Sequence, residues 1–145
     1  MIYTPLTKKA MQLCFDSHKE QVDKSGMPYI FHPLILAEQM NTEETTIVAL
    51  LHDVVEDTSI TLEDLRSMGF GHTVLEAINL MTHKKGVPYM EYVAAIKENP
   101  IARQVKIADL RHNSTLSRLD AVGQRDLERV AKYKKALDFL TDDEK

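Results

Sequence analysis

Residues 47–58 read IVALLHDVVEDT, an apolar run that leads directly into four ionisable side chains. If the segment is helical, His52 lies one turn before Glu56. Asp53 likewise lies one turn before Asp57. A metal site and an acid–base pair could then share one buried helix end, because charged groups in apolar surroundings are costly unless they are paired or bound to metal. A helix that becomes polar as it reaches solvent would contain the same residues, so this stretch alone leaves both interpretations open.

The composition is that of a single globular domain built from helices. The chain has 145 residues, of which 43% are hydrophobic and 28% are charged, a length that allows one domain with its own core. With only five glycines and five prolines, helices are favoured over a turn-rich β fold. We therefore expect one domain over residues 1–145.

Cysteine content, hydropathy and charge exclude several other classes of protein. The single cysteine, Cys14, excludes an internal disulfide and a thiolate zinc cluster, and it fits the cytoplasm, where we expect the protein. No apolar run approaches the roughly 18–20 residues that span a bilayer, and no secretory signal pattern is present. The net charge of −4 argues against a nonspecific nucleic-acid binder but permits a small anionic substrate. We expect no membrane or nucleic-acid partner, and the oligomeric state stays open.

Apolar spacing and helix-start signals divide the chain into about eight helices. Proline opens several of them, at Pro5, Pro33 and Pro88, and Thr61 begins a near capping box. No segment alternates at period two for long enough to predict a strand. The expected helices span about residues 5–22, 33–40, 42–57, 62–68, 74–81, 88–96, 101–113 and 123–140. The predicted fold class is all-α, a compact helical bundle.

Side chains that bind metals follow apolar residues in three separate segments. They are His32, the pair His52-Asp53, and Asp109. Two imidazoles and two carboxylates make a mixed nitrogen–oxygen site without sulfur, which suits Mn²⁺, Fe²⁺, Co²⁺ or Zn²⁺, and ligand type alone does not choose among them. Four protein ligands leave positions open for water and a phosphate oxygen.

Glu56 and Asp57 would lie beside such a water. One could orient or deprotonate it and the other could protonate the leaving oxygen, but both could also be ordinary charges at a helix end. His112 is expected to support the site or the fold rather than to bind metal. Lys106 and Arg111 belong to a group of Lys and Arg residues that are most simply surface charges, although two or three of the group could line a pocket for a polyanionic substrate.

Four stretches carry a resemblance to a known family. Residues 24–33 read KSGMPYIFHP, residues 49–58 ALLHDVVEDT, residues 61–65 TLEDL, and residues 105–113 VKIADLRHN. In this order they resemble the hydrolase domain of the RelA/SpoT alarmone family, within the HD phosphohydrolase superfamily, and more closely its free-standing small alarmone hydrolases. The resemblance covers roughly residues 8–119.

The resemblance implies an α-helical HD domain that removes pyrophosphate from the 3′ position of ppGpp or pppGpp, giving GDP or GTP. It implies that Glu56 and Asp57 act on the water and the leaving group. It places Lys24 and Ser25 in the substrate loop and Asn113 at the nucleotide. The residues that it implies as ligands of Mn²⁺ are His32, His52, Asp53 and Asp109.

Two departures from the family pattern concern the substrate rather than the metal. The family usually has Arg at the position of Asp23, where it packs against guanine, and Asp can neither stack as a cation nor neutralise phosphate. Leu110-Arg111 stands where many members have Arg followed by Leu. The alternatives are therefore another phosphorylated nucleotide as substrate, such as a nicotinamide dinucleotide phosphate or a nucleoside phosphate, and a noncatalytic nucleotide sensor.

Overall fold

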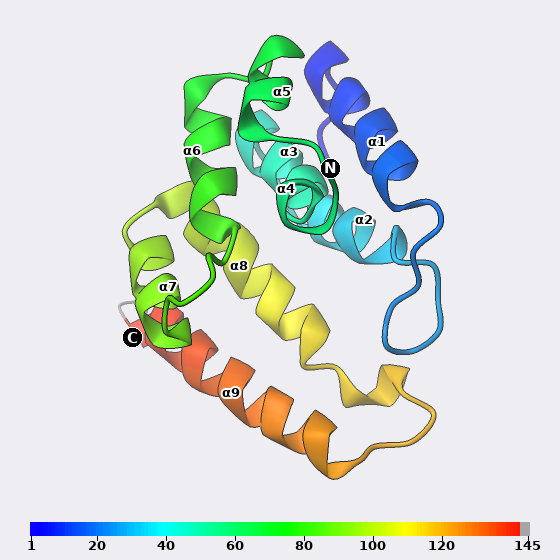
Figure 1. Cartoon of the computed structure of the whole chain (residues 1–145), viewed down its shortest axis with the longest axis vertical. Coiled ribbons are helices and arrows are strands. Elements are labelled where there is room, and N and C mark those ends of the chain that lie inside the picture. Colours follow the sequence, from blue (N-terminus) through cyan, green and yellow to red (C-terminus); the bar gives the residue numbers. More distant parts are fainter. Residues whose placement is uncertain (143–145) are drawn as a thin grey trace.

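The computed structural model describes residues 1–142 as a bundle of α-helices (Figure 1), which confirms the all-α fold. In this part of the chain the only β pairing is an isolated antiparallel bridge between Val22 and Pro28. The last three residues of the expected domain, 143–145, lie outside the described part. The elements are α1 (Pro5–His18), α2 (Phe31–Glu38), α3 (Glu43–Leu51), α4 (Val54–Asp57), α5 (Leu62–Ser67), α6 (His72–Met81), α7 (Tyr89–Lys97), α8 (Pro100–Asn113), a 3₁₀ turn η1 (Leu116–Arg118) and α9 (Gln124–Thr141).

Helix α3 forms the centre of the core. All seven residues from 45 to 51 are buried, and α3 packs against α1, α2, α6 and α8. An apolar run without a polar face has to be enclosed on every side, because a helix that is hydrophobic all round cannot present a face to water. Thr42 begins the helix, since its hydroxyl accepts a hydrogen bond from the Thr45 N–H at 3.1 Å. The site residues at the C-terminal end of α3 are thus anchored in the buried centre of the fold.

The expected helix over residues 42–57 is wrong in one respect, because it is broken at His52 and Asp53. Asp53 has φ −102° and ψ −3°, which turns the backbone out of the α3 axis and starts α4. Within a continuous helix, neighbouring residues point in different directions and their side chains do not face each other. The break removes this restriction, so that the side chains of His52 and Asp53 approach each other, with 3.1 Å between Nε2 and Oδ2.

Other helix boundaries follow the sequence signals closely. Thr4 and Thr61 form capping boxes at the starts of α1 and α5, and Asn99 caps α8 ahead of Pro100. The first helix is shorter than expected, because the chain turns after His18 and Val22 instead pairs with Pro28. Helix α2 starts at Phe31, two residues before the expected Pro33.

Helices α8 and α9 form the lower part of the bundle in Figure 1, with α9 packed along α8 and against α7. Residues 114–123, which include η1, connect them and face the loop that joins α1 to α2 across a pocket described below. In residues 1–142, no helix combines the length and apolar character that crossing a membrane requires.

Candidate metal centre and substrate pocket

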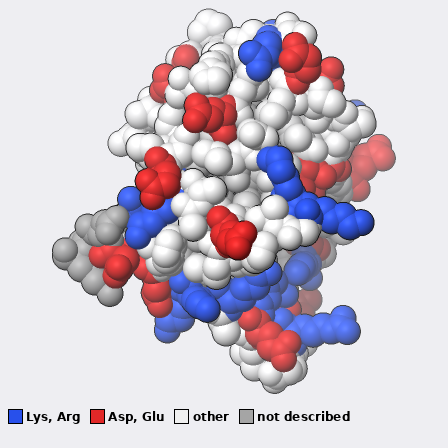
Figure 2. Space-filling view, turned by 60° about the vertical axis from the view of Figure 1, so that its left-hand side comes forward, with Lys and Arg blue, Asp and Glu red and all other residues white. Residues whose placement is uncertain are grey.

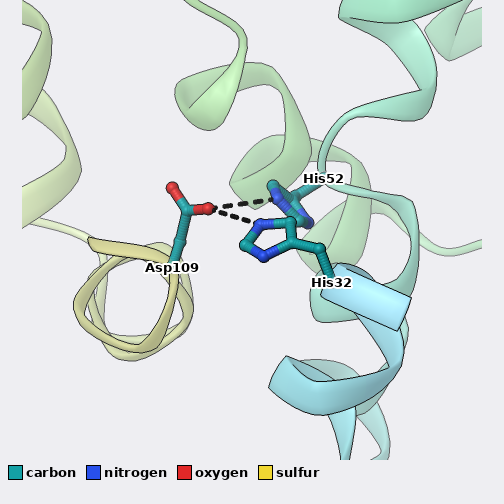
Figure 3. A group of neighbouring side chains, drawn as sticks. All are labelled: His32, His52 and Asp109. Carbon is teal, nitrogen blue, oxygen red and sulfur yellow. Dashed lines mark hydrogen bonds and ion pairs between the residues drawn. The ribbon is translucent and has the colours of Figure 1, made fainter. Parts of the chain in front are cut away.

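Three of the four predicted metal ligands meet in the interior of the bundle (Figure 3). His32 comes from α2, His52 from the end of α3, and Asp109 from α8. His32 Nε2 lies 2.8 Å from Asp109 Oδ1, and His52 Nε2 lies 3.6 Å from the same oxygen. One ligand atom from each residue falls within 4.8 Å of the others, and the three residues are 3–5% exposed. Segments far apart in the chain therefore direct two imidazoles and a carboxylate at one point.

Asp53, the fourth predicted ligand, lies against this group. Its Oδ2 is 3.1 Å from His52 Nε2 and also accepts a hydrogen bond from the Tyr29 hydroxyl. Burial, together with the nearby carboxylates of Asp109 and Asp57, raises the pKa of Asp53 well above its usual value. The negative charges of Asp53 and Asp109 repel each other, and a cation bound by both would relieve the repulsion.

The donor atoms fit a divalent cation. His52 Nδ1 lies 2.7 Å from the Ala49 carbonyl, so this nitrogen carries the proton and Nε2 presents a lone pair. That Nε2 is buried and makes no hydrogen bond with a described residue, although it lies near Asp53. A buried polar atom without a partner is costly. A metal bound by His32, His52 and the carboxylates would provide that partner, and nitrogen and oxygen ligands suit Mn²⁺, Fe²⁺, Co²⁺ or Zn²⁺.

His112 supports His32, as the sequence suggested. The two rings stack, with centroids 4.8 Å apart and an interplanar angle of 17°, and their Nδ1 atoms are 2.6 Å apart. Burial and the neighbouring His32 lower the pKa of His112 to about 4, and burial also lowers the pKa of His32. Both rings are therefore neutral at pH 7. When His32 Nδ1 donates to His112, the Nε2 of His32 offers its lone pair to the centre.

Lys106 is buried, which contradicts the expectation of a surface charge. Its Nζ donates to Asp109 Oδ2 at 2.9 Å and lies 5.3 Å from the centre of the Tyr92 ring. Although burial opposes ionisation, Lys106 holds the pKa of Asp109 well below its usual range. Asn113 Nδ2 donates to the other oxygen at 3.1 Å, so both oxygens of Asp109 are oriented. The sequence contains a signal for this pair, because Lys106 precedes Asp109 by about one helical turn within the apolar segment at residues 105–110.

Glu56 and Asp57 lie exposed on α4, beside the buried group. Partial burial and the charge of Asp57 raise the pKa of Glu56. Asp57 lines the pocket of about 590 Å³ described next, whereas Glu56 is not among its lining residues, so α4 presents the two carboxylates to different surroundings. The expected alignment of His52 with Glu56 along one continuous helix does not occur, because the chain breaks between them.

A pocket of about 590 Å³ opens next to the buried group. Tyr29 and Asn113 connect the two, since each lines the pocket and bonds to a predicted metal ligand. The structure thus brings the predicted substrate residues Lys24, Ser25 and Asn113 into one cavity with Asp57. The lining residues are Gln21, Val22, Asp23, Lys24, Ser25, Tyr29, Asp57, Asn113, Thr115, Arg118, Leu119, Arg129 and Tyr133.

The lining of the pocket contains more cations than carboxylates despite the negative net charge, although Arg118 is paired with Asp23 and Arg129 with Asp126. Lys24, Arg118 and Arg129 line it, against the two carboxylates of Asp23 and Asp57. Figure 2 shows Lys and Arg gathered over the lower part of the molecule, the level at which Figure 1 places α9, and five of the residues of α9 are Lys or Arg. Local cations can reverse the field of an acidic chain.

Known proteins with similar sequences are enzymes named for guanosine polyphosphate metabolism. No family model matches the chain. The chain is 33% identical over 118 residues to the guanosine-3′,5′-bis(diphosphate) 3′-pyrophosphohydrolase of Aquifex aeolicus. The aligned region covers 73% of this chain and 17% of that protein. It is 36% identical over 96 residues to the bifunctional (p)ppGpp synthase/hydrolase SpoT of Escherichia coli, and this alignment covers 63% of this chain and 14% of that protein. The chain belongs to the RelA/SpoT family.

Family members with other names also match. The GTP pyrophosphokinase of Streptomyces coelicolor is 36% identical over 146 residues, covering 92% of this chain and 16% of that protein. The chain thus spans about one sixth of the length of these curated relatives. A solved structure of a metazoan ortholog of SpoT, described as hydrolysing ppGpp, superposes with a TM-score of 0.68 over 99% of this chain and 98% of that one. Its sequence identity is 22%, so this likeness concerns the fold.

Proposed function

We propose that the chain is a Mn²⁺-dependent hydrolase that removes the 3′-pyrophosphate of ppGpp or pppGpp, giving GDP or GTP. The observation that carries the proposal is the convergence of His32, His52 and Asp109 within 4.8 Å, beside a pocket to which Tyr29 and Asn113 connect them. Relatives named as 3′-pyrophosphohydrolases of guanosine bis(diphosphate) support the choice of substrate. The expected single domain, and a cytoplasmic location, belong to the same proposal.

The metal would be held by His32, His52, Asp53 and Asp109. When bound, the cation supplies a water of lowered pKa and screens the charge of the phosphate. The protein orients three of these ligands through four hydrogen bonds: His52 is fixed by the Ala49 carbonyl, Asp53 by the Tyr29 hydroxyl, and Asp109 by Lys106 and Asn113. Such supporting hydrogen bonds set the direction of a ligand before it binds.

Glu56 and Asp57 would handle the protons of the reaction. Glu56 has a raised pKa, which suits a group that takes a proton from water, and Asp57 lines the pocket, where it could protonate the leaving oxygen. Lys24 and Ser25 would contact the phosphates from the loop between α1 and α2. Asn113 would contact the nucleotide from the end of α8, where it also orients Asp109.

The test is an assay of the purified protein with Mn²⁺ and ppGpp that follows the release of GDP and pyrophosphate. The Asp53→Ala protein is expected to lose both metal retention and turnover. Asp138→Ala removes an exposed carboxylate on α9 and serves as the matched control. The proposal is supported if the unaltered protein and Asp138→Ala release GDP and pyrophosphate in a metal-dependent way while Asp53→Ala does not. Poor turnover of ppGpp with efficient turnover of a nicotinamide dinucleotide phosphate or a nucleoside phosphate contradicts it, and so does nucleotide binding without turnover.

A further inference from the structure

An ion pair joins two walls of the pocket that are 95 residues apart in the sequence. Arg118 Nη2 donates to Asp23 Oδ2 at 2.8 Å, and both residues line the cavity. Asp23 belongs to the loop between α1 and α2, and Arg118 ends η1. The pair therefore connects the two segments that a nucleotide would have to lie between.

Asp23 is fully used by its own loop and by Arg118. Its Oδ1 accepts hydrogen bonds from the Ser25 N–H at 2.8 Å, the Ser25 hydroxyl at 2.5 Å and the Met27 N–H at 3.1 Å. Although burial opposes the change, these bonds and the one from Arg118 lower the pKa of Asp23, so the carboxylate is charged at pH 7. Gly26, at φ +81°, permits the tight turn that brings these donors together. With three hydrogen bonds to Oδ1 and one to Oδ2, Asp23 serves as a fixed support.

Arg118 is held at both ends of its guanidinium. Nη1 donates to the His112 carbonyl at 3.0 Å while Nη2 donates to Asp23, and the side chain remains 26% exposed. A guanidinium that is paired with a carboxylate and anchored through two nitrogens has little charge left for phosphate. Its planar face remains, and such a face stacks well on aromatic rings. Lys24 is exposed and makes no hydrogen bond or ion pair with residues 1–142, so it is better suited to contact phosphate.

We propose that Arg118 binds the base of the nucleotide by stacking, and that Asp23 acts as the positioning residue that fixes the plane of Arg118. The inference rests on the proposed function, because it names how the same pocket would recognise its substrate. It assigns the preference to a purine nucleotide, since two fused rings cover more of a fixed guanidinium than the single ring of a pyrimidine.

The first test compares Arg118→Lys with the unaltered protein on ppGpp and on its cytidine counterpart. Lysine keeps the charge but lacks the planar face, so KM for ppGpp should rise about tenfold. The kcat should stay within about twofold, because stacking on the base stabilises the bound substrate and the transition state equally. For the cytidine counterpart, used as substrate or competitive inhibitor, the loss should be smaller. Arg66→Lys is the matched control, because Arg66 pairs with a carboxylate on exposed α5, away from the pocket.

The second test is a double-mutant cycle with Asp23→Asn. If Asp23 acts through Arg118, the single change raises KM, and adding it to Arg118→Lys brings no further loss. If the increases in KM of the two single variants multiply in the double variant, Asp23 does not act through Arg118 and the positioning role is overturned. An unchanged KM in Arg118→Lys, or an equal loss for both bases, would overturn the stacking. Thermal unfolding of each variant shows that it folds, and Arg118→Gln, which keeps a smaller planar group, should lose less than Arg118→Lys. Absent turnover of ppGpp by the unaltered protein would instead reject the proposed function itself.

Discussion

Lys106 Nζ lies 2.9 Å from Asp109 Oδ2, and both side chains are buried. The pair places a permanent positive charge next to the carboxylate that α8 contributes to the candidate metal centre. Its geometry favours the ionised form of Asp109 in the metal-free protein.

Lys106→Met should destabilise the metal-free protein by about 3 kcal/mol, because it leaves Asp109 buried without its cation. The free energy of unfolding, measured by urea titration in EDTA, provides the check. Addition of Mn²⁺ should reduce the difference, since a bound cation would compensate the same carboxylate. Lys8→Met, at an exposed position of α1, is the control, and equal stability of the two variants would contradict the assigned role.

His112→Ala should weaken Mn²⁺ binding by about tenfold, because His32 loses the ring that stacks on it and accepts from its Nδ1. Isothermal titration calorimetry measures the change directly, without an assay of activity. His72→Ala removes an exposed imidazole that pairs with Glu76 on the same helix, and it should leave the affinity unchanged. An unaltered affinity in His112→Ala would show that His32 is oriented by the backbone alone.

Glu56→Gln should keep the metal and lose turnover by about 100-fold, the usual size of a general acid–base contribution. Within residues 1–142, Glu56 makes no hydrogen bond or ion pair with His32, His52, Asp53 or Asp109, so Mn²⁺ affinity should match that of the unaltered protein. Metal content and kcat are measured on the same sample, with Glu63→Gln on α5 as the control. Full turnover by Glu56→Gln would reject the role assigned to this carboxylate.

Cys14 should not react with alkylating reagents in the folded protein at pH 8. Burial, with a smaller effect of Asp53, raises the pKa of the thiol to about 12. Because the folded pKa lies far above pH 8, only about one molecule in ten thousand carries a thiolate, and that thiolate is enclosed. Mass spectrometry after iodoacetamide treatment should show no adduct in buffer and one adduct in urea. An adduct formed rapidly in buffer would mean that α1 opens in the native state.

Much of the fold and of the metal centre could be predicted from local signals. Capping residues and prolines mark the helix starts, and a His or Asp after an apolar run indicates a polar group that enters the core. His32, His52 and Asp109 meet as those signals suggested. The position of Asp53 beside them also agrees with the prediction, although its role as a ligand stays a proposal.

The parts that could not be predicted depend on contacts between distant segments. Tyr29 reaches Asp53 over 24 residues, and Arg118 reaches Asp23 over 95 residues. No periodicity in a single sequence encodes such pairs, because they depend on how the loops are placed by the packed helices. The break after α3 was missed for a related reason, since helical spacing continues through residues 52–57 while the backbone turns at Asp53.

The junction between α3 and α4 also determines which changes in length the gene can tolerate. Loss or gain of one residue within α3 would rotate its end by about 100° and shift it by about 1.5 Å. His52 would then miss Asp109, and Asp53 would leave its place beside His52, even with every side chain retained. Insertions in the connection between α8 and α9 would leave that point untouched. Insertions and deletions should therefore be absent from residues 43–53 in active relatives and collect in residues 119–123.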